Sequence, residues 1–171
     1  MVSEGELRPM QLVQVRIDDR LIHGQVVVGW RSDLKMNRIL LCSDEVANSD
    51  WQTTIYLSAV PDDIDASVLS VEDTIGTLLN NRFGNQKVVL LVDSPKTIVT
   101  LLKAGVKIDE VNVGGLHFKP GKSQISPFIF VDQEDIDNFE VLHEHGIKLD
   151  GRDVPTRPSL DVAKLLNLGT R

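Results

Sequence analysis

The residues best suited to chemistry follow the first apolar segment of the chain, residues 12–17. Asp18, Asp19 and Arg20 come directly after it, and His23 and Gly24 lie a few positions further on. A neutral imidazole is a nucleophile, and a guanidinium can bind two phosphate oxygens at once. A neighbouring carboxylate can accept a ring N–H and orient the imidazole. A lone histidine in such a place is more often a capping or surface residue, so the pattern alone leaves both interpretations open.

Two elements must position these side chains. Residues 12–17 have the composition of a buried strand, and the spacing of Val26, Val27 and Trp30 predicts a helix that begins at His23 and Gly24. In an open α/β sheet, ligands bind at loops that leave the carboxyl ends of strands. A helix N-terminus favours the neutral form of a histidine and attracts anions such as a phosphoryl group.

The rest of the chain alternates between strand and helix patterns. We expect strands at residues 12–17, 37–43, 65–70, 87–93, 110–113, 126–131 and 147–154. Helix starts are expected near Ser49, Ser70, Ser94, Asp132 and Ser159. The alternation predicts an α/β fold, with a single domain over residues 11–171. Its mostly parallel sheet should have about seven strands and helices on both faces. Residues 1–10 are expected to be a loose N-terminal extension.

Three details of the helices can be checked in a structure. Ser49 and Gln52 fit a capping box, and Trp51 is expected in the core on one side of the helix that follows. The acidic residues after Asp132 (Glu134, Asp135 and Asp137) look like the solvated face of a helix start. Cys42 lies in an apolar run and should be buried.

Four loops should meet at one edge of the sheet, because they leave the carboxyl ends of strands: residues 18–23, 43–44, 93–94 and 114–117. Ser94 could donate a hydrogen bond to phosphate or simply cap a helix. Gly114 and Gly115 permit either a close backbone approach or a tight turn. Of Asp18 and Asp19, one could orient His23 and the other could hold Arg20 or the loop. His117 is expected to be a solvent-exposed loop residue.

Composition excludes several classes of protein. The formal net charge of −7 over 171 residues argues against nucleic acid as a partner. The single cysteine excludes an internal disulfide, and His143 and His145 are two apart on an expected helix, so a metal site is not expected. No apolar stretch is long enough to span a membrane and no signal peptide is recognisable, so we expect a cytoplasmic protein.

The segment RIDDRLIHGQ, residues 16–25, resembles the active-site segment of the IIB subunits of the mannose/fructose/sorbose family of the bacterial sugar phosphotransferase system. The loop NVGGLHF, residues 112–118, and a closing strand with Val154 and Pro155 also resemble that family. The similarity extends from about residue 11 to residue 166.

The resemblance implies that His23 is phosphorylated on Nδ1 by a IIA partner. His23 then passes the phosphoryl group to a sugar presented by membrane subunits IIC and IID, and Arg20 is the arginine of the same loop. Such a protein is a protein-Nπ-phosphohistidine–sugar phosphotransferase that needs neither metal nor cofactor. It would lie in the cytoplasm, peripheral to the inner face of the membrane. The sequence is also compatible with a homo-oligomer.

Two other functions remain open at this point. A regulatory protein of the same fold could be phosphorylated without any link to transport. A phosphohistidine phosphatase or mutase would also carry a His-Gly pair, but those enzymes have an arginine directly before the histidine, where this chain has Ile22.

Overall fold

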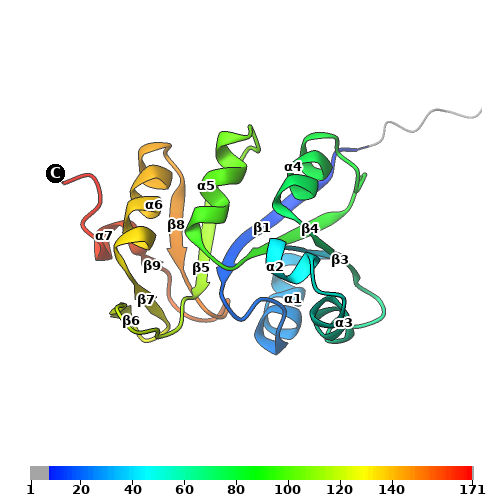
Figure 1. Ribbon diagram of the computed structural model, residues 1–171, viewed down its shortest axis with the longest axis horizontal. Coiled ribbons are helices and arrows are strands. Elements are labelled where there is room, and N and C mark those ends of the chain that lie inside the picture. The colour runs from blue at the N-terminus through cyan, green and yellow to red at the C-terminus, as the bar shows by residue number, and fades with distance from the viewer. Residues whose placement is uncertain (1–7, 171) are drawn as a thin grey trace, which may run out of the picture.

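The first strand lies at the centre of the fold, between two parallel neighbours (Figure 1). The structure is a computed structural model that describes residues 8–170. Its strand order is β3-β2-β4-β1-β5-β8-β9, and all neighbouring pairs are parallel except β8 and β9. The predicted α/β class and the mostly parallel seven-stranded sheet are therefore confirmed.

The bounds of the strands are β1 Gln11–Asp18, β2 Arg38–Cys42, β3 Asp65–Leu69, β4 Lys87–Val92, β5 Glu110–Gly115, β6 Ser123–Ser126, β7 Ile129–Val131, β8 Lys148–Gly151 and β9 Leu160–Asp161. The α-helices are α1 Arg31–Leu34, α2 Asp44–Ala47, α3 Asp50–Ser58, α4 Val71–Leu79, α5 Pro95–Lys103, α6 Gln133–Glu144 and α7 Val162–Leu165. One π-helical turn, η1, spans Gln25–Gly29.

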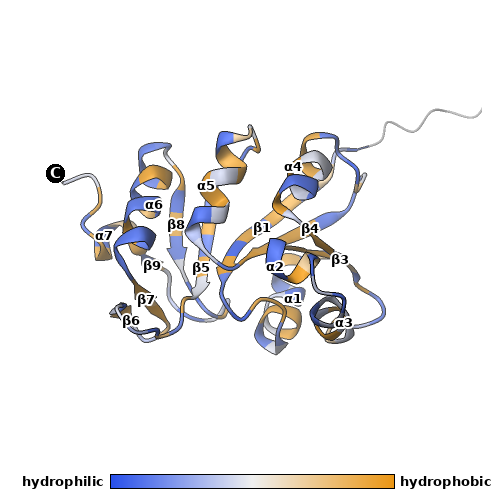
Figure 2. Ribbon diagram, viewed as in Figure 1, coloured by the Kyte–Doolittle hydropathy of each residue, from blue (hydrophilic) through white to orange (hydrophobic). Residues whose placement is uncertain are grey.

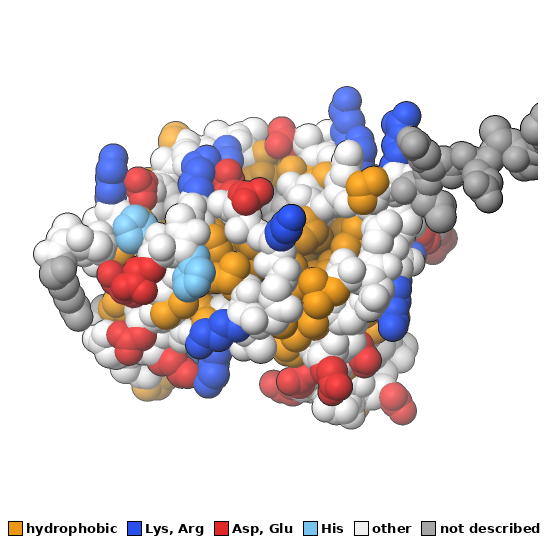
Figure 3. Space-filling view, turned by 90° about the horizontal axis from the view of Figure 1, so that it is seen from above, with side chains coloured by type: hydrophobic (Ala, Val, Ile, Leu, Met, Phe, Trp, Pro, Cys, Tyr) orange, Lys and Arg blue, Asp and Glu red, His pale blue; other side chains and the backbone are white. Residues whose placement is uncertain are grey.

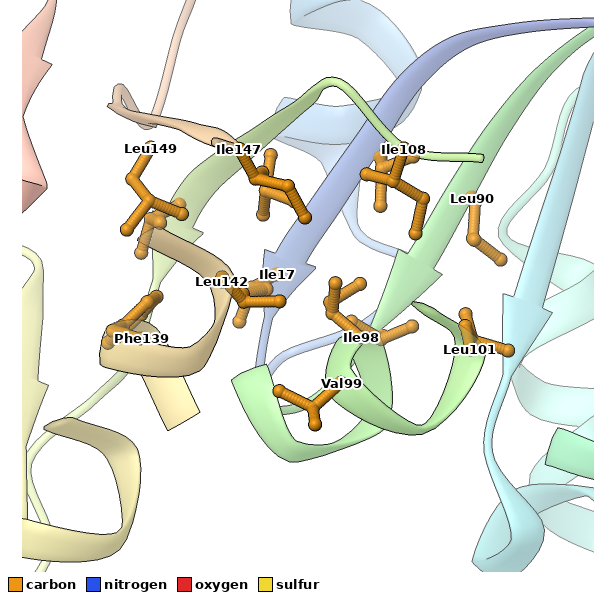
Figure 4. Close-up of a cluster of buried hydrophobic side chains, with 14 of the residues drawn as sticks. Ile17, Leu90, Ile98, Val99, Leu101, Ile108, Phe139, Leu142, Ile147 and Leu149 are labelled. Atoms are coloured by element: carbon orange, nitrogen blue, oxygen red, sulfur yellow. The ribbon is translucent and has the colours of Figure 1, made fainter. Parts of the chain in front are cut away.

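Successive residues of the central strands enter two separate cores, one on each face of the sheet. Leu90 belongs to the cluster that α5 and α6 cover, whereas Leu91 belongs to the cluster beneath η1. Figure 4 shows Ile98 on α5 and Phe139 on α6 within the first cluster. Burial on both faces explains why β4 is apolar along nearly its whole length, whereas β1 also carries hydrophilic residues (Figure 2).

Several predicted boundaries are wrong. The strand expected at 126–131 is instead the hairpin β6–β7, which forms a separate antiparallel sheet. Pro127 lies at its turn, where it has no backbone N–H to give to a strand ladder. The main sheet has seven strands only because the short antiparallel strand β9 joins its edge.

The C-terminal region also differs from the prediction. The strand expected at 147–154 ends at Gly151, because the carbonyls of Arg152 and Asp153 turn away to bind the Arg16 side chain. The last helix does not open at Pro158 and Ser159. It begins at Val162, and the Asp161 side chain caps it by accepting from the backbone N–H of Lys164.

Helix α3 is not a core helix. Trp51 is 66% exposed, so its expected place in the core is wrong. No residue of α3 is buried, and Ser49 makes no capping hydrogen bond with its side chain. Partial burial of Tyr56 and Val60 attaches this segment to the core instead.

The acidic start of α6 is only partly solvated. Asp135 is buried, contrary to the expectation, and binds the Lys122 ammonium at 2.5 Å. Together with Asp132 it forms a reciprocal capping box at the helix start. Cys42 is fully buried, as expected.

Residues 1–7 of the predicted N-terminal extension lie outside the described residues. Arg8–Met10 have no regular structure, and the backbone N–H of Met10 donates to the Asn81 side chain at 2.7 Å. Figure 3 shows the molecule from above the view of Figure 1. On that face lysine and arginine side chains lie scattered among acidic and apolar ones instead of forming one basic patch.

Candidate active site

The strand order brings three of the predicted loops together. β1 pairs with β4 on one side and with β5 on the other, so residues 18–23, 93–94 and 114–117 leave adjacent strands at the same edge. The backbone N–H of Asp19 donates to the Gly115 carbonyl at 3.1 Å, which extends the β1–β5 contact into the loops. The expected convergence of these loops depended on this strand order.

Asp18 is the centre of the site. Its carboxylate is fully buried, and one oxygen, Oδ2, accepts from Arg16 at 2.9 Å and lies 2.8 Å from Nε2 of His23. The other oxygen accepts from the backbone N–H of Arg20 at 3.1 Å. Burial by itself would raise the pKa of Asp18, but the hydrogen bond with His23 and the charge of Arg16 lower that pKa well below its usual range. Asp18 is therefore a carboxylate at neutral pH.

The contact with Asp18 assigns different roles to the two ring nitrogens of His23. A carboxylate accepts hydrogen bonds, so the neutral ring carries its proton on Nε2 and leaves a lone pair on Nδ1. The His23 side chain is 18% exposed, so the ring is held firmly while an edge remains open to solvent. The predicted orienting role of one aspartate thus fits Asp18, and Nδ1 is the nitrogen free to react.

The backbone turns helical after His23, as predicted, but as a π-helical turn: Gly24 is already in the αR region, and the backbone N–H groups of Val26 and Val27 donate to the His23 carbonyl at 3.1 Å. Gly24 precedes the five-residue π-helical turn η1, and α1 begins only at Arg31. So short a turn is a weak source of a helix dipole, so the site depends on side chains for its charge. Leu21 has a positive φ of 60°, a strained conformation for a leucine, and burial of its side chain holds the loop in this shape.

Arg16 is a functional residue to which the sequence analysis assigned no role. Its side chain is fully buried, donates to Asn112 at 2.6 Å and to the Asp153 carbonyl at 3.1 Å, and lies 5.6 Å from the Trp30 ring centre. Burial lowers the pKa of the Arg16 guanidinium, whereas Asp18 raises it. The sequence signal that could have revealed it was a charged residue between the apolar Val15 and Ile17.

Arg20 lies at the surface of the same cluster. Its Nε is 3.4 Å from Asp18, and its guanidinium donates to the Gln25 side chain at 2.9 Å. The side chain is 39% exposed, so part of the guanidinium remains available to an anion on His23. The contact with Asp18 also supports the alternative that Arg20 only holds an aspartate in position.

Gly114 and Gly115 belong to strand β5, and neither has a positive φ. A Cβ on Gly114 would lie 2.0 Å from Cζ of Arg16, and one on Gly115 would lie 3.3 Å from Oδ1 of Asp18. Of the two alternatives, close approach is the one observed, and the tight turn is not. The groups that approach are the Arg16 side chain at Gly114 and the His117 and Asp18 side chains at Gly115.

Asp19 binds His117 and not Arg20. One oxygen accepts from the His117 backbone N–H at 2.8 Å, and the other lies 2.5 Å from Nδ1 of its ring. His117 is 44% exposed, so the expectation of a free loop histidine is only partly right. The ligand atoms of Asp18, Asp19 and His117 lie within 4.8 Å of one another. All three side chains already have hydrogen-bond partners, and a metal-free mechanism remains our prediction.

A cavity of about 560 Å³, which we call the α3 cavity, adjoins the loop that carries His23. Asp19 and Leu21 line it on that side, Trp51 on α3 lies opposite, and Ser94 belongs to the wall. The Ser94 hydroxyl makes no capping hydrogen bond and lies 3.4 Å from the Thr97 hydroxyl. Its structural role as a helix cap is therefore not observed, and its contact with phosphate stays a prediction.

Residues 12–170 match the family model described as the PTS system sorbose subfamily IIB component. This chain belongs to that family. It is 38% identical to the sorbose-specific EIIB component of Lacticaseibacillus casei over 153 residues, which cover 90% of this chain and 93% of the relative. It is also 39% identical to the mannose-specific EIIAB component of Escherichia coli K12, over 89% of this chain and 47% of that longer protein.

The fold of this IIB component agrees with that of solved relatives. The crystal structure of the IIB domain of the sorbose permease from Klebsiella pneumoniae matches with a TM-score of 0.87 at 35% identity, covering 92% of this chain and 97% of that one. Membership of the sorbose subfamily implies a role in phosphotransferase sugar transport.

Proposed function

We propose that this IIB component accepts a phosphoryl group from a IIA protein on Nδ1 of His23 and transfers it to a sugar during uptake. The observation that carries the proposal is the 2.8 Å contact between Nε2 of His23 and Asp18. It holds the ring in one tautomer and leaves Nδ1 as the only ring nitrogen free to attack phosphorus.

Loading of His23 requires no change in the buried part of the site. The Nδ1 lone pair attacks phosphorus as the bond from the phosphoryl group to the donor histidine breaks. The phosphorylated ring keeps its proton on Nε2, and the Asp18 carboxylate stabilises the positive charge that the ring acquires. Arg16 holds Asp18 in place from the buried side.

Transfer to sugar returns the bonding electron pair to His23. A sugar hydroxyl oxygen attacks phosphorus and loses its proton to solvent, the P–N bond breaks, and the electron pair of that bond returns to Nδ1. Phosphoryl transfer depends mainly on positioning and on stabilising charge on the transferred oxygens. Arg20 is the partly exposed cation beside His23 and is suited to that stabilisation. The loops around Arg20 and His23 are held in place by the other proposed site residues, namely Asp18, Asp19, Gly24, Ser94, Gly114 and Gly115.

The names of the relatives support the proposed partners. The Escherichia coli relative is described as an EIIAB component, a name that joins A and B components in one protein, which supports IIA as the donor. Sorbose and mannose are the sugars named for the relatives. None of the described helices is long and apolar enough to cross a bilayer. We propose that membrane subunits IIC and IID present the sugar and hold this chain at the inner face of the membrane.

The assignment of His23 can be tested by intact-protein mass spectrometry. The wild-type chain, incubated with phosphoenolpyruvate, the general phosphotransferase proteins and IIA, should gain one acid-labile phosphoryl group. His23→Ala should gain none, because the accepting nitrogen is removed, while His145→Ala should be phosphorylated normally. His145 is an exposed histidine at the end of α6 and serves as the matched control. Phosphorylation of the His23→Ala variant would contradict the assignment.

A further inference from the structure

The α3 cavity combines a buried apolar floor with an exposed apolar wall. Leu21 and Val46 line it and are both buried, whereas Trp51 and Ile55 line it from α3 and are both largely exposed. Trp51 and Ile55 are four residues apart, so their side chains lie on the same face of the helix. A large apolar pair of this kind beside a cavity marks a surface that another molecule covers.

The charge around this cavity is mainly acidic. Six carboxylates line it, those of Asp19, Glu45, Asp93, Asp132, Glu134 and Asp135. The lysines that line it are Lys119 and Lys122. Lys122 pairs with Asp135 at 2.5 Å and Lys96 pairs with Glu134 at 2.8 Å, so Glu45 and Asp93 are the lining carboxylates that contribute most to the remaining negative charge. A partner that fits this surface must therefore bring apolar side chains together with positive charge.

We propose that the α3 cavity docks a lysine- or arginine-rich segment from the cytoplasmic side of a membrane subunit, with an apolar side chain of that segment against Trp51 and Ile55. Cytoplasmic loops of membrane proteins carry an excess of lysine and arginine, which complements the acidic lining. The inference rests on the proposed function, because it states whether IIA or the membrane subunits bind this surface.

The position of the cavity suits the second transfer step. Asp19 and Leu21 belong to the same loop as His23, so a segment seated in the cavity contacts the loop that carries the phosphoryl group. Docking there would bring the membrane subunit that presents the sugar next to the phosphorylated ring. The same contact would make transfer from His23 dependent on salt, because the complementary charges are partly exposed to solvent.

The experiment separates loading from transfer. The purified chain is first phosphorylated by IIA, and its rate of loading is measured. The loaded chain is then titrated into membrane vesicles that carry sorbose-type IIC and IID subunits, with sorbose, mannose or fructose as the acceptor. The variants are Trp51→Ser, Ile55→Ser and Glu45→Lys. Leu79→Ser on α4 is the control, because Leu79 is also exposed and apolar but lies outside this cavity.

We expect all four variants to be loaded by IIA at the wild-type rate and to keep the wild-type melting temperature. Trp51→Ser should raise the KM of the vesicles for the loaded chain about tenfold, since large aromatic side chains dominate such contacts. Ile55→Ser and Glu45→Lys should raise the KM as well, and Glu45→Lys should weaken its dependence on salt. Leu79→Ser should leave the KM unchanged.

Three outcomes would overturn the inference. An unchanged KM in Trp51→Ser and Ile55→Ser would show that the cavity is not a docking surface. Slower loading in these variants with a normal KM would assign the surface to IIA. Equal KM effects in the Leu79→Ser control would show that the changes are not specific to the cavity. Failure of the wild-type chain to be loaded at His23 is a different result, which contradicts the proposed function itself.

Discussion

Asp18 accepts hydrogen bonds on both carboxylate oxygens while it is fully buried. Oδ2 joins the buried cation of Arg16 to the imidazole of His23, and Oδ1 accepts from the backbone of Arg20. Removing one partner from such a buried charged group costs more than the loss of a surface ion pair, because the remaining charge is left without compensation. Asp18 therefore links the buried Arg16 side chain to the orientation of the His23 ring.

Replacing Asp18 should change how stability depends on pH. The pKa of Asp18 in the folded chain is lowered from its ordinary value of about 3.9. Its contribution to stability is therefore fully present above that value and is lost as the pH falls towards the lowered folded-state pKa. At pH 7 the free energy of unfolding of Asp18→Asn should be lower than that of the wild type by about 3–5 kcal/mol. The variant should lose less of its remaining stability on acidification.

Chemical denaturation from pH 7 down to pH 3 measures both effects. Asp19→Asn is the matched control, because Asp19 lies next in the chain and binds His117 instead of Arg16 and His23. Its loss of stability at pH 7 should be smaller than that of Asp18→Asn, because Asp19 lies outside the fully buried pair of Arg16 and Asp18. An Asp18→Asn variant with wild-type stability and an unchanged acid slope would show that the buried cluster does not stabilise the fold.

Strand β5 contributes to the site by lacking side chains at its carboxyl end. Gly114 faces the buried guanidinium of Arg16, and any side chain there would occupy the same space. The stretch 152–153 approaches Arg16 from another side with two backbone carbonyls. Strands β1 and β5 and the segment after β8 must therefore leave a channel between them for the Arg16 side chain.

Gly114→Ala should displace Arg16 and thereby loosen Asp18. Its new Cβ would lie 2.0 Å from Cζ of Arg16, and overpacking of this kind costs about 1–3 kcal/mol. Phosphorylation of His23 by IIA should slow in the folded variant, because the support of the ring is disturbed. Denaturant melts and loading rates measure the two effects.

Gly76→Ala is the control for that variant. Gly76 lies within α4, and a Cβ there would meet nothing within 4 Å. This control should be stabilised by about 0.5–1 kcal/mol, since alanine is the better helix former. Wild-type stability and loading in Gly114→Ala would contradict the close packing of Arg16 against Gly114.

At the scale of the whole molecule, two cores flank one sheet and fix the position of its carboxyl edge. The larger cluster includes Phe139 and Leu142 from α6 and Ile98 from α5, all fully buried (Figure 4). The second lies beneath η1 and includes Val26 and Val27, which follow the His23 loop directly. Packing on that face therefore anchors the segment that carries the reactive histidine.

Phe139→Ala should lower the free energy of unfolding by about 3–5 kcal/mol, the usual cost of removing a fully buried aromatic ring. Phe118→Ala is the matched control, because Phe118 is largely exposed and contacts Phe130 edge to face. Its effect should stay below about 1.5 kcal/mol. Similar losses in both variants, measured by urea denaturation, would contradict the division of these two rings into core and surface.

The sequence by itself determined the order of the main elements and the location of the reactive loop. Apolar runs and helix caps are local signals, so β1, β2, β4 and the loop from Asp18 to His23 were predictable from neighbouring residues. The resemblance in residues 16–25 pointed to His23 without any knowledge of tertiary contacts. The predicted ends of strands were wrong where a side chain distant in the sequence binds the backbone. At residues 152–153, for example, the carbonyls accept hydrogen bonds from Arg16.

Tertiary structure decided which atoms meet. Arg16 and Asn112 are 96 residues apart, and Asp19 and His117 are 98 apart, so their pairing depends on β5 lying next to β1. The same pairing of β5 with β1 places Gly114 where its missing side chain leaves space for the Arg16 guanidinium. Trp51 was expected in the core because periodicity reports one face of a helix, but whether another element covers that face depends on how the helix sits on the sheet. Strand order and side-chain contact are properties of the folded chain, which explains why the contact between Nε2 of His23 and Asp18, the physical reason for a free Nδ1, is seen only in the structure.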